Sequence, residues 1–112
     1  MPHAVFSSPQ VGSVGENEDR LKADGIPYTA VTRGYDSTAW GWALGDEGSF
    51  AKLLVSEDRK ILGAHIIGPS ASILIQEFVT PMRLGLTVDE MKKVIYTHPA
   101  ASELIENAFL DA

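Results

Sequence analysis

The stretch 49–68 constrains the fold of this chain more than any other. Apolar residues alternate loosely with polar ones over 49–56, a charged turn occupies 57–60, and 61–68 is apolar almost throughout. Two strands joined by a short polar turn form an antiparallel hairpin. Because the second strand is apolar at nearly every position, we expect it to be a central strand that is covered on both faces.

Shorter elements precede this hairpin. The sequence predicts extended segments at 4–6 and 11–15, and a strand at 28–33 that is rich in β-branched and aromatic residues. Between them, Asn17 is a suitable N-cap for a helix over about 18–24, because its side-chain oxygen accepts a hydrogen bond from a free backbone N–H group. The chain therefore opens with strand, helix and strand.

Three helices are expected after the hairpin. The first runs from Pro69 to about Leu84 and carries an apolar stripe too wide for one packing face, so we expect burial against the sheet and against a partner. Pro81 should kink or end it, because proline removes a helical hydrogen bond. Thr87 and Glu90 form the pattern of a capping box for a short helix that ends near Val94.

The last helix is expected over about 100–110, which completes an α+β domain. Its antiparallel sheet should have the helices packed on one side. The 112 residues are 45% hydrophobic, which suits one domain, 1–112, with a single core. Trp40 and Trp42 are two residues apart and share a face in a strand, where they would pack in the core or at a subunit contact; lining a ligand cleft is the alternative.

Composition excludes several classes of protein. The chain has no cysteine, so it contains no disulfide scaffold, thiolate metal site or dithiol redox centre of its own. Its formal net charge is −6 and no cluster of lysine and arginine stands out, so we expect neither nucleic acid nor a membrane as partner. No apolar run is long enough to span a membrane and no signal peptide is evident, so we expect a cytoplasmic protein.

The most informative polar residues lie near the C-terminus. His98 precedes a helix start, Pro99 restricts the backbone beside it, and Glu103 follows five residues later in the first turn of the helix. A carboxylate on one ring nitrogen fixes the tautomer of an imidazole and aims the other nitrogen, which can then move a proton near neutral pH. We therefore take His98 and Glu103 as candidate catalytic residues that form half of an active site.

A structural interpretation of the same residues remains open. An exposed histidine before a helix often has no role, and a glutamate in a first turn favours the helix dipole by itself. His65 lies within the predicted strand 61–68, where a hydrogen-bonded structural histidine is expected, and His3 is near the terminus. The three histidines are widely separated, so no metal site is expected.

The order of motifs along the chain resembles the C-terminal dimerisation domain of the pyridine nucleotide-disulfide oxidoreductases. The matching stretches cover almost the whole chain: 5–9, 14–15, 49–53, 61–69, and His98-Pro99 with Glu103. Within that family, residues 38–44 and the run from His98-Pro99-Ala100 to 106–108 are most similar to the mycothione reductase branch. Many relatives have threonine, a helix cap, at the position of Ala100.

The resemblance implies an enzyme of which this chain is one part. Such enzymes are homodimers whose N-terminal domains bind FAD and NAD(P)H and carry a redox-active cysteine pair. The dimerisation domain supplies a histidine to the partner subunit's dithiol site, oriented by a glutamate; His98 and Glu103 match these positions, and the peptide before Pro99 is expected to be cis. The FAD- and NAD(P)-binding domains are absent from this chain, so we expect no cofactor bound to it and no turnover from it alone.

A second hypothesis belongs to a different class. The chain could be a stand-alone homodimerisation module in which His98 is only structural. In either case we expect a dimer that forms through the helix over 70–84 and the segment near 95–103. Hydrolysis by His98 and Glu103 is disfavoured, because no serine has the context of a catalytic nucleophile and cysteine is lacking.

Overall fold

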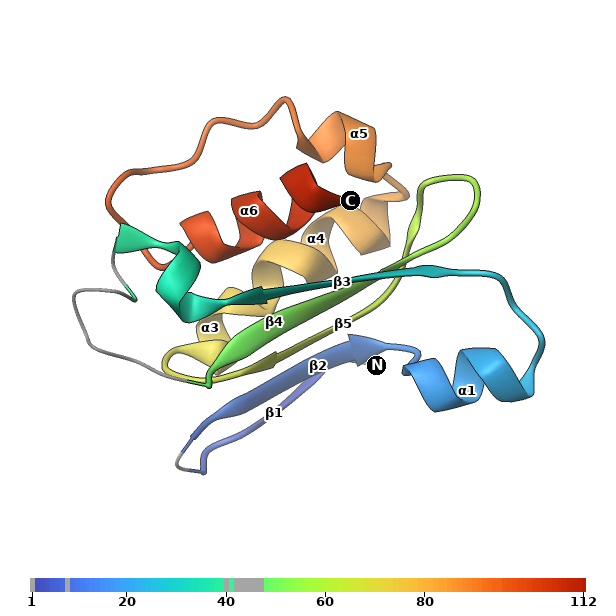
Figure 1. Cartoon of the computed structure of the whole chain (residues 1–112), viewed down its shortest axis with the longest axis horizontal. Coiled ribbons are helices and arrows are strands. Elements are labelled where there is room, and N and C mark those ends of the chain that lie inside the picture. Colours follow the sequence, from blue (N-terminus) through green and yellow to red (C-terminus); the bar gives the residue numbers. More distant parts are fainter. Residues whose placement is uncertain (1, 8, 40, 42–47) are drawn as a thin grey trace.

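The computed structural model describes residues 2–7, 9–39, 41 and 48–112. Within these residues the chain forms a five-stranded antiparallel sheet in the order β1-β2-β5-β4-β3, with helices on one face (Figure 1). The strands are β1 (His3–Val5), β2 (Val11–Gly15), β3 (Thr29–Gly34), β4 (Phe50–Val55) and β5 (Ile61–Ile67). The predicted hairpin is therefore β4-β5, and β5 is the central strand as expected.

The register of the sheet places the core on one face. Val14 of β2 and Leu53 of β4 both lie opposite Ala64 of β5, and all three are buried. Successive side chains of a strand point to opposite faces, so Ser13, His65 and Lys52, which also lie opposite one another, share the other face. The two faces thus differ in chemistry: one is apolar and closed, and the other is partly polar.

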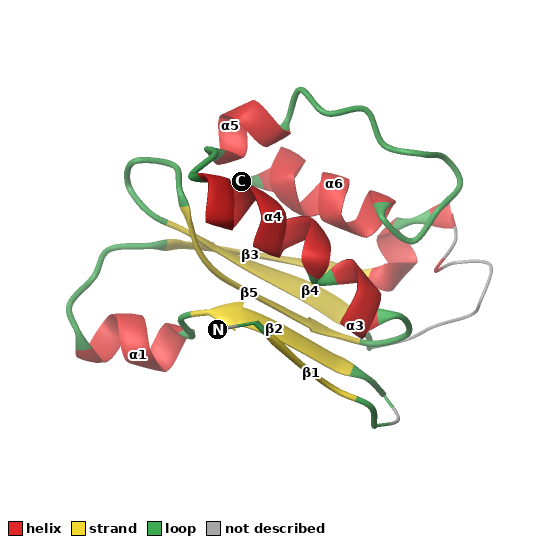
Figure 2. Ribbon diagram, turned by 180° about the vertical axis from the view of Figure 1, so that it is seen from behind, coloured by secondary structure: helices red, strands yellow, loops and turns green. Residues whose placement is uncertain are grey.

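The helices cover the apolar face (Figures 1 and 2). On this side lie α3 (Ala71–Leu74), α4 (Gln76–Leu84), α5 (Val88–Met91) and α6 (Glu103–Asp111), while a 3-10 turn at Tyr35–Ser37 follows β3. The small helix α1 (Glu18–Ala23) lies away from them, beyond the other face of the sheet (Figure 2). The predicted fold class, an α+β domain with an antiparallel sheet and helices on one side, is confirmed.

The expectation that β5 is covered on both faces is wrong. On the face opposite the large helices, Leu54 and Leu21 of α1 are fully buried, but Phe50, His65 and Ile67 remain partly exposed. The apolar run that led to the expectation contains Gly63 and Ala64, which bury little surface, and its outward-facing middle position is His65. A continuous apolar stretch therefore overstated how much of this face is covered.

The helix expected from Pro69 to Leu84 is divided into α3 and α4, which meet at Ile75. Ser70 adopts a left-handed conformation with φ of 61°, so helical geometry begins only after it. Pro81 does not end α4, which continues to Leu84. Gly85, at φ of 70°, ends the helix, and its N–H donates to the carbonyl of Met82. The helix therefore continues past Pro81 despite the loss of the one hydrogen bond that proline removes.

Several boundaries shift while the capping residues are confirmed. Asn17 accepts a hydrogen bond from the N–H of Arg20 at 2.8 Å, and Thr87 and Glu90 form both bonds of the capping box. The helix that follows this box ends at Met91 rather than Val94, and the last helix starts at residue 103 rather than 100. Trp40 and Trp42, for which packing was expected, lie outside the described residues.

The last helix, α6, packs on β3 and β4, and an aromatic pair joins it to α4. The rings of Phe78 and Phe109 are fully buried and meet edge to face, with centroids 5.3 Å apart and planes inclined at 64°. Such aromatic pairs contribute beyond the area they bury. Because α6 begins at Glu103, its packing also determines where that carboxylate stands.

We expect Phe109→Ala to lower the free energy of unfolding by about 3–5 kcal/mol, because it removes a fully buried ring and leaves a cavity. Leu110→Ala, at the adjacent exposed position of the same helix, is the matched control and should change it by less than about 0.5 kcal/mol. Urea unfolding followed by circular dichroism measures both. Equal effects of the two substitutions would contradict the packing described for α6.

Candidate functional site

His98 lies in a bend between two helices. The segment 92–102 leaves α5, runs outside the helical layer and returns to α6 (Figure 1). The side chain of His98 is 69% exposed, whereas that of Glu103 is 16% exposed. The peptide between His98 and Pro99 is cis, as the resemblance implied. The bend thus presents an imidazole to solvent in front of a mostly buried carboxylate.

The two candidate residues are in direct contact. Nδ1 of His98 and Oε1 of Glu103 are 2.7 Å apart, the short distance typical of a hydrogen bond to a charged group. An ionised carboxylate only accepts hydrogen bonds, so Nδ1 carries the hydrogen. In the neutral ring Nε2 therefore keeps its lone pair, which is the arrangement of a general base whose tautomer is held by an acid.

Glu103 is itself held in place by the backbone. Its Oε1 also accepts a hydrogen bond from the N–H of Ala100 at 3.1 Å. Ser102, the N-cap residue of α6, makes no side-chain capping bond, so this carboxylate satisfies a backbone donor ahead of the helix. A carboxylate in a first helical turn can satisfy a free backbone N–H group, and here the donor is Ala100.

The rest of α6 keeps the carboxylate from moving. Leu104, Ile105, Ala108 and Phe109 are buried on one side of the helix, and Asn107 donates to the carbonyl of Ser37 at 3.3 Å. A catalytic pair needs such rigid support, because small displacements of a reacting group are costly. The helix therefore fixes Glu103, and Glu103 fixes the ring of His98.

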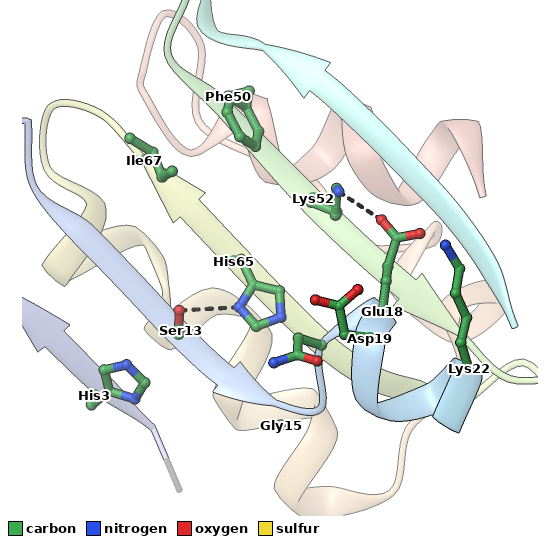
Figure 3. A pocket seen from close by; sticks show the side chains of 11 residues that line it. His3, Ser13, Gly15, Glu18, Asp19, Lys22, Phe50, Lys52, His65 and Ile67 are labelled. Carbon is green, nitrogen blue, oxygen red and sulfur yellow. Dashed lines mark hydrogen bonds and ion pairs between the residues drawn. The ribbon is translucent and has the colours of Figure 1, made fainter. Parts of the chain in front are cut away.

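His65 lies in a different setting, a cleft of about 610 Å³ on the partly polar face of the sheet (Figure 3). Its Nδ1 is 3.0 Å from Oγ of Ser13 and its Nε2 is 3.0 Å from the carbonyl oxygen of Glu16. Because a carbonyl only accepts, Nε2 is the donor and, in the neutral ring, Nδ1 accepts from the hydroxyl. Both nitrogens are engaged, which confirms the expected structural histidine; His3 lies at the rim of the same cleft.

Two of the charged residues that line this cleft, Lys52 and Glu18, form an ion pair. Lys52 lies 2.6 Å from one carboxylate oxygen of Glu18, and the hydroxyl of Tyr28 donates to the other at 2.8 Å. The bond from Lys52, followed by that from Tyr28, lowers the pKa of Glu18 below its usual value, and the same carboxylate raises the pKa of Tyr28. Glu18 therefore links α1 to the sheet through Lys52 of β4, a contact that no sequence pattern indicated.

The described residues form neither a metal site nor a membrane-spanning helix. Among the residues that the structure describes, no three histidine, aspartate or glutamate side chains gather as a metal site would require. The described helices are all too short or too polar to cross a bilayer. His98 and Glu103 thus remain the best-formed candidate site.

Comparisons with known proteins agree on one family. Residues 1–109 match the family model described as the pyridine nucleotide-disulphide oxidoreductase, dimerisation domain. A mycothione reductase from Mycobacterium tuberculosis is 40% identical over 112 residues, which cover 98% of this chain and 24% of that protein. A dihydrolipoyl dehydrogenase from Geobacillus stearothermophilus is 37% identical over 109 residues, or 96% and 23%. The chain thus spans about a quarter of these curated relatives.

A solved structure shares the fold of this chain. The crystal structure of LpdA from Mycobacterium tuberculosis superposes on 99% of this chain with a TM-score of 0.91 at 20% sequence identity, and the match covers 24% of that protein. At this identity the likeness shows the fold alone.

We expect the ring of His98 to exist mainly as the Nδ1–H tautomer at a pH where it is neutral. Glu103→Ala should shift the tautomer towards Nε2–H, because the acceptor for Nδ1 is lost. Two-bond ¹H–¹⁵N spectra of the imidazole report the tautomer directly. Glu106→Ala, in the same helix but without a hydrogen bond to His98, is the control; an unchanged tautomer in Glu103→Ala would contradict the pairing.

Proposed function

Because this chain belongs to the dimerisation-domain family of the pyridine nucleotide-disulphide oxidoreductases, we propose that it supplies half of an active site to a second copy of itself. Residues 1–112 would be a single interface domain of a longer FAD-dependent, NAD(P)H-dependent disulfide reductase. The observation that carries the proposal is the contact between His98 and Glu103, in which a mostly buried acid orients an exposed imidazole.

The proposed role of His98 is proton transfer at a dithiol of the partner subunit. When a thiolate attacks a disulfide, a new sulfur–sulfur bond forms, the old one breaks, and the departing thiolate needs a proton. Nε2 of His98 would take the proton from the attacking thiol and return it to the leaving sulfur. Glu103 would stabilise the imidazolium between these steps and hold the ring in place.

In the described part of this chain, neither Gly12 nor Gly15 is placed to form a phosphate-binding loop. A Cβ added at Gly12 or Gly15 would lie 2.6 or 2.3 Å from a backbone oxygen of Ala71 or Leu62, so both glycines serve close packing rather than a phosphate loop. Lys52, a cation in the cleft, is paired with Glu18. We therefore place the cofactors in the N-terminal domains of the longer enzyme and derive no step of the chemistry through them.

The proposed substrate is a low-molecular-weight disulfide such as mycothione. The support is the 40% identity to a mycothione reductase, compared with 37% to a dihydrolipoyl dehydrogenase. Ala100 agrees with this choice, because it stands where many relatives have a threonine that caps the helix. We place the enzyme in the cytoplasm, without nucleic acid or membrane partners.

In the full-length enzyme, we expect His98→Gln to slow disulfide reduction about 10²–10⁴-fold while flavin reduction by NAD(P)H stays nearly intact. Rapid-mixing spectroscopy separates these two half-reactions. Glu103→Ala should be milder, because it disturbs orientation and leaves the imidazole present. Equal losses in both half-reactions would exclude the role given to His98, and no loss in either would favour the alternative, a homodimerisation module without catalytic function.

We also expect the domain to form a homodimer through α3, α4 and the segment near 95–103. Ile73, Leu84 and Ile95 are large apolar residues that this surface leaves 73%, 68% and 95% exposed. Ile95→Asp should therefore shift the mass measured by light scattering at micromolar concentration towards the monomer. Leu110→Asp, at an exposed apolar position outside this surface, should not; a monomeric wild-type chain would count against the two-sided burial of the α3–α4 region.

A further inference from the structure

One residue stands out in the arm that carries His98, which we define as residues 92–99. Apart from Tyr96, the residues of the arm are exposed; Ile95, for example, is 95% exposed. Tyr96 is partly buried and packs against the hydrophobic core. Of the side chains in the arm, that of Tyr96, two residues before His98, is the one that packs against the hydrophobic core.

Backbone hydrogen bonds do not replace this contact. On the α5 side, the last one is from the N–H of Val94 to the carbonyl of Met91, at 3.2 Å. On the α6 side, support resumes only where Ala100 contacts Glu103. Within the part of the chain that the structure describes, residues 95–99 make a single hydrogen bond, that of His98 with Glu103. Between Val94 and His98, the packing of the Tyr96 side chain is therefore the contact that holds the arm to the core.

The surroundings of Tyr96 indicate that its ring is the anchor. Burial, together with the negative charges of Glu77 on α4 and Glu106 on α6, raises the pKa of Tyr96 to about 12, so the phenol is neutral at physiological pH. Its hydroxyl oxygen is buried and has no hydrogen-bond partner among the described residues. The packed ring therefore provides the attachment, and the hydroxyl contributes no bond of its own.

We infer that Tyr96 is a positioning residue, which fixes the arm on the core and so determines where His98 is presented. This inference rests on the proposed function for its catalytic meaning. It separates two tasks: Glu103 sets the tautomer and tilt of the imidazole through a local contact, and Tyr96 sets the place of the whole bend. Both are needed, because a correctly oriented base that is displaced by about 1 Å loses much of its effect.

The two tasks are separable by NMR on the 112-residue chain. In Tyr96→Ala, backbone order parameters at residues 94–98 should fall from about 0.85 to below about 0.6, while the ring of His98 keeps its Nδ1–H tautomer. In Glu103→Ala the reverse is expected, with a changed tautomer and an ordered Tyr96. Tyr96→Phe should behave as wild type, because it keeps the ring.

Unchanged order parameters in Tyr96→Ala, or an arm as mobile in Tyr96→Phe as in Tyr96→Ala, would overturn the inference. If Tyr96→Ala fails to fold, the order parameters of Tyr96→Leu, which keeps an apolar side chain but lacks the ring, are compared with those of Tyr96→Phe instead. In the full-length enzyme, Tyr96→Ala should slow disulfide reduction about 10- to 100-fold and spare flavin reduction, and Tyr96→Phe should restore the rate. If His98→Gln proves silent, the proposed function fails while the order parameters still decide the role of Tyr96.

Discussion

The site depends on one carboxylate oxygen that accepts two hydrogen bonds. Oε1 of Glu103 receives the ring N–H of His98 and the backbone N–H of Ala100, so the acid both orients the imidazole and stabilises the bend around it. The acid can do this because α6 is locked to the core through Phe109 and its neighbours. Packing in the interior thereby determines the geometry of an exposed nitrogen.

His65 in the sheet and His98 in the bend show how the surroundings decide the role of one residue type. His65 uses both ring nitrogens on Ser13 and Glu16, which leaves no free site for chemistry. His98 uses one nitrogen and exposes the other. A proton can be exchanged with another molecule only in the second arrangement, which is why a function is proposed for His98 and a structural role for His65.

The sequence correctly predicted features that are set by residues close to one another in the chain, and it missed features that are not. The hairpin β4-β5, the cap at Asn17 and the capping box of α5 are set by residues close in the chain, and all were predicted. The spacing from His98 to Glu103 also sufficed to predict their contact. The family resemblance, confirmed by the comparisons, extended this to the whole domain.

The features that were missed are not set by a short pattern. The break between α3 and α4 at Ile75 and the continuation of α4 beyond Pro81 depend on backbone geometry that the residue types leave open, and α6 begins at Glu103, three residues after the predicted start. The role of Tyr96 could not be inferred either, because no pattern tells which residue of an irregular arm is buried.

The most direct measurement of the central claim is a structure of the full-length homodimer. We expect Nε2 of His98 within hydrogen-bond reach, directly or through one water, of a cysteine sulfur of the partner subunit; a ring that faces only solvent or its own subunit would contradict the claim.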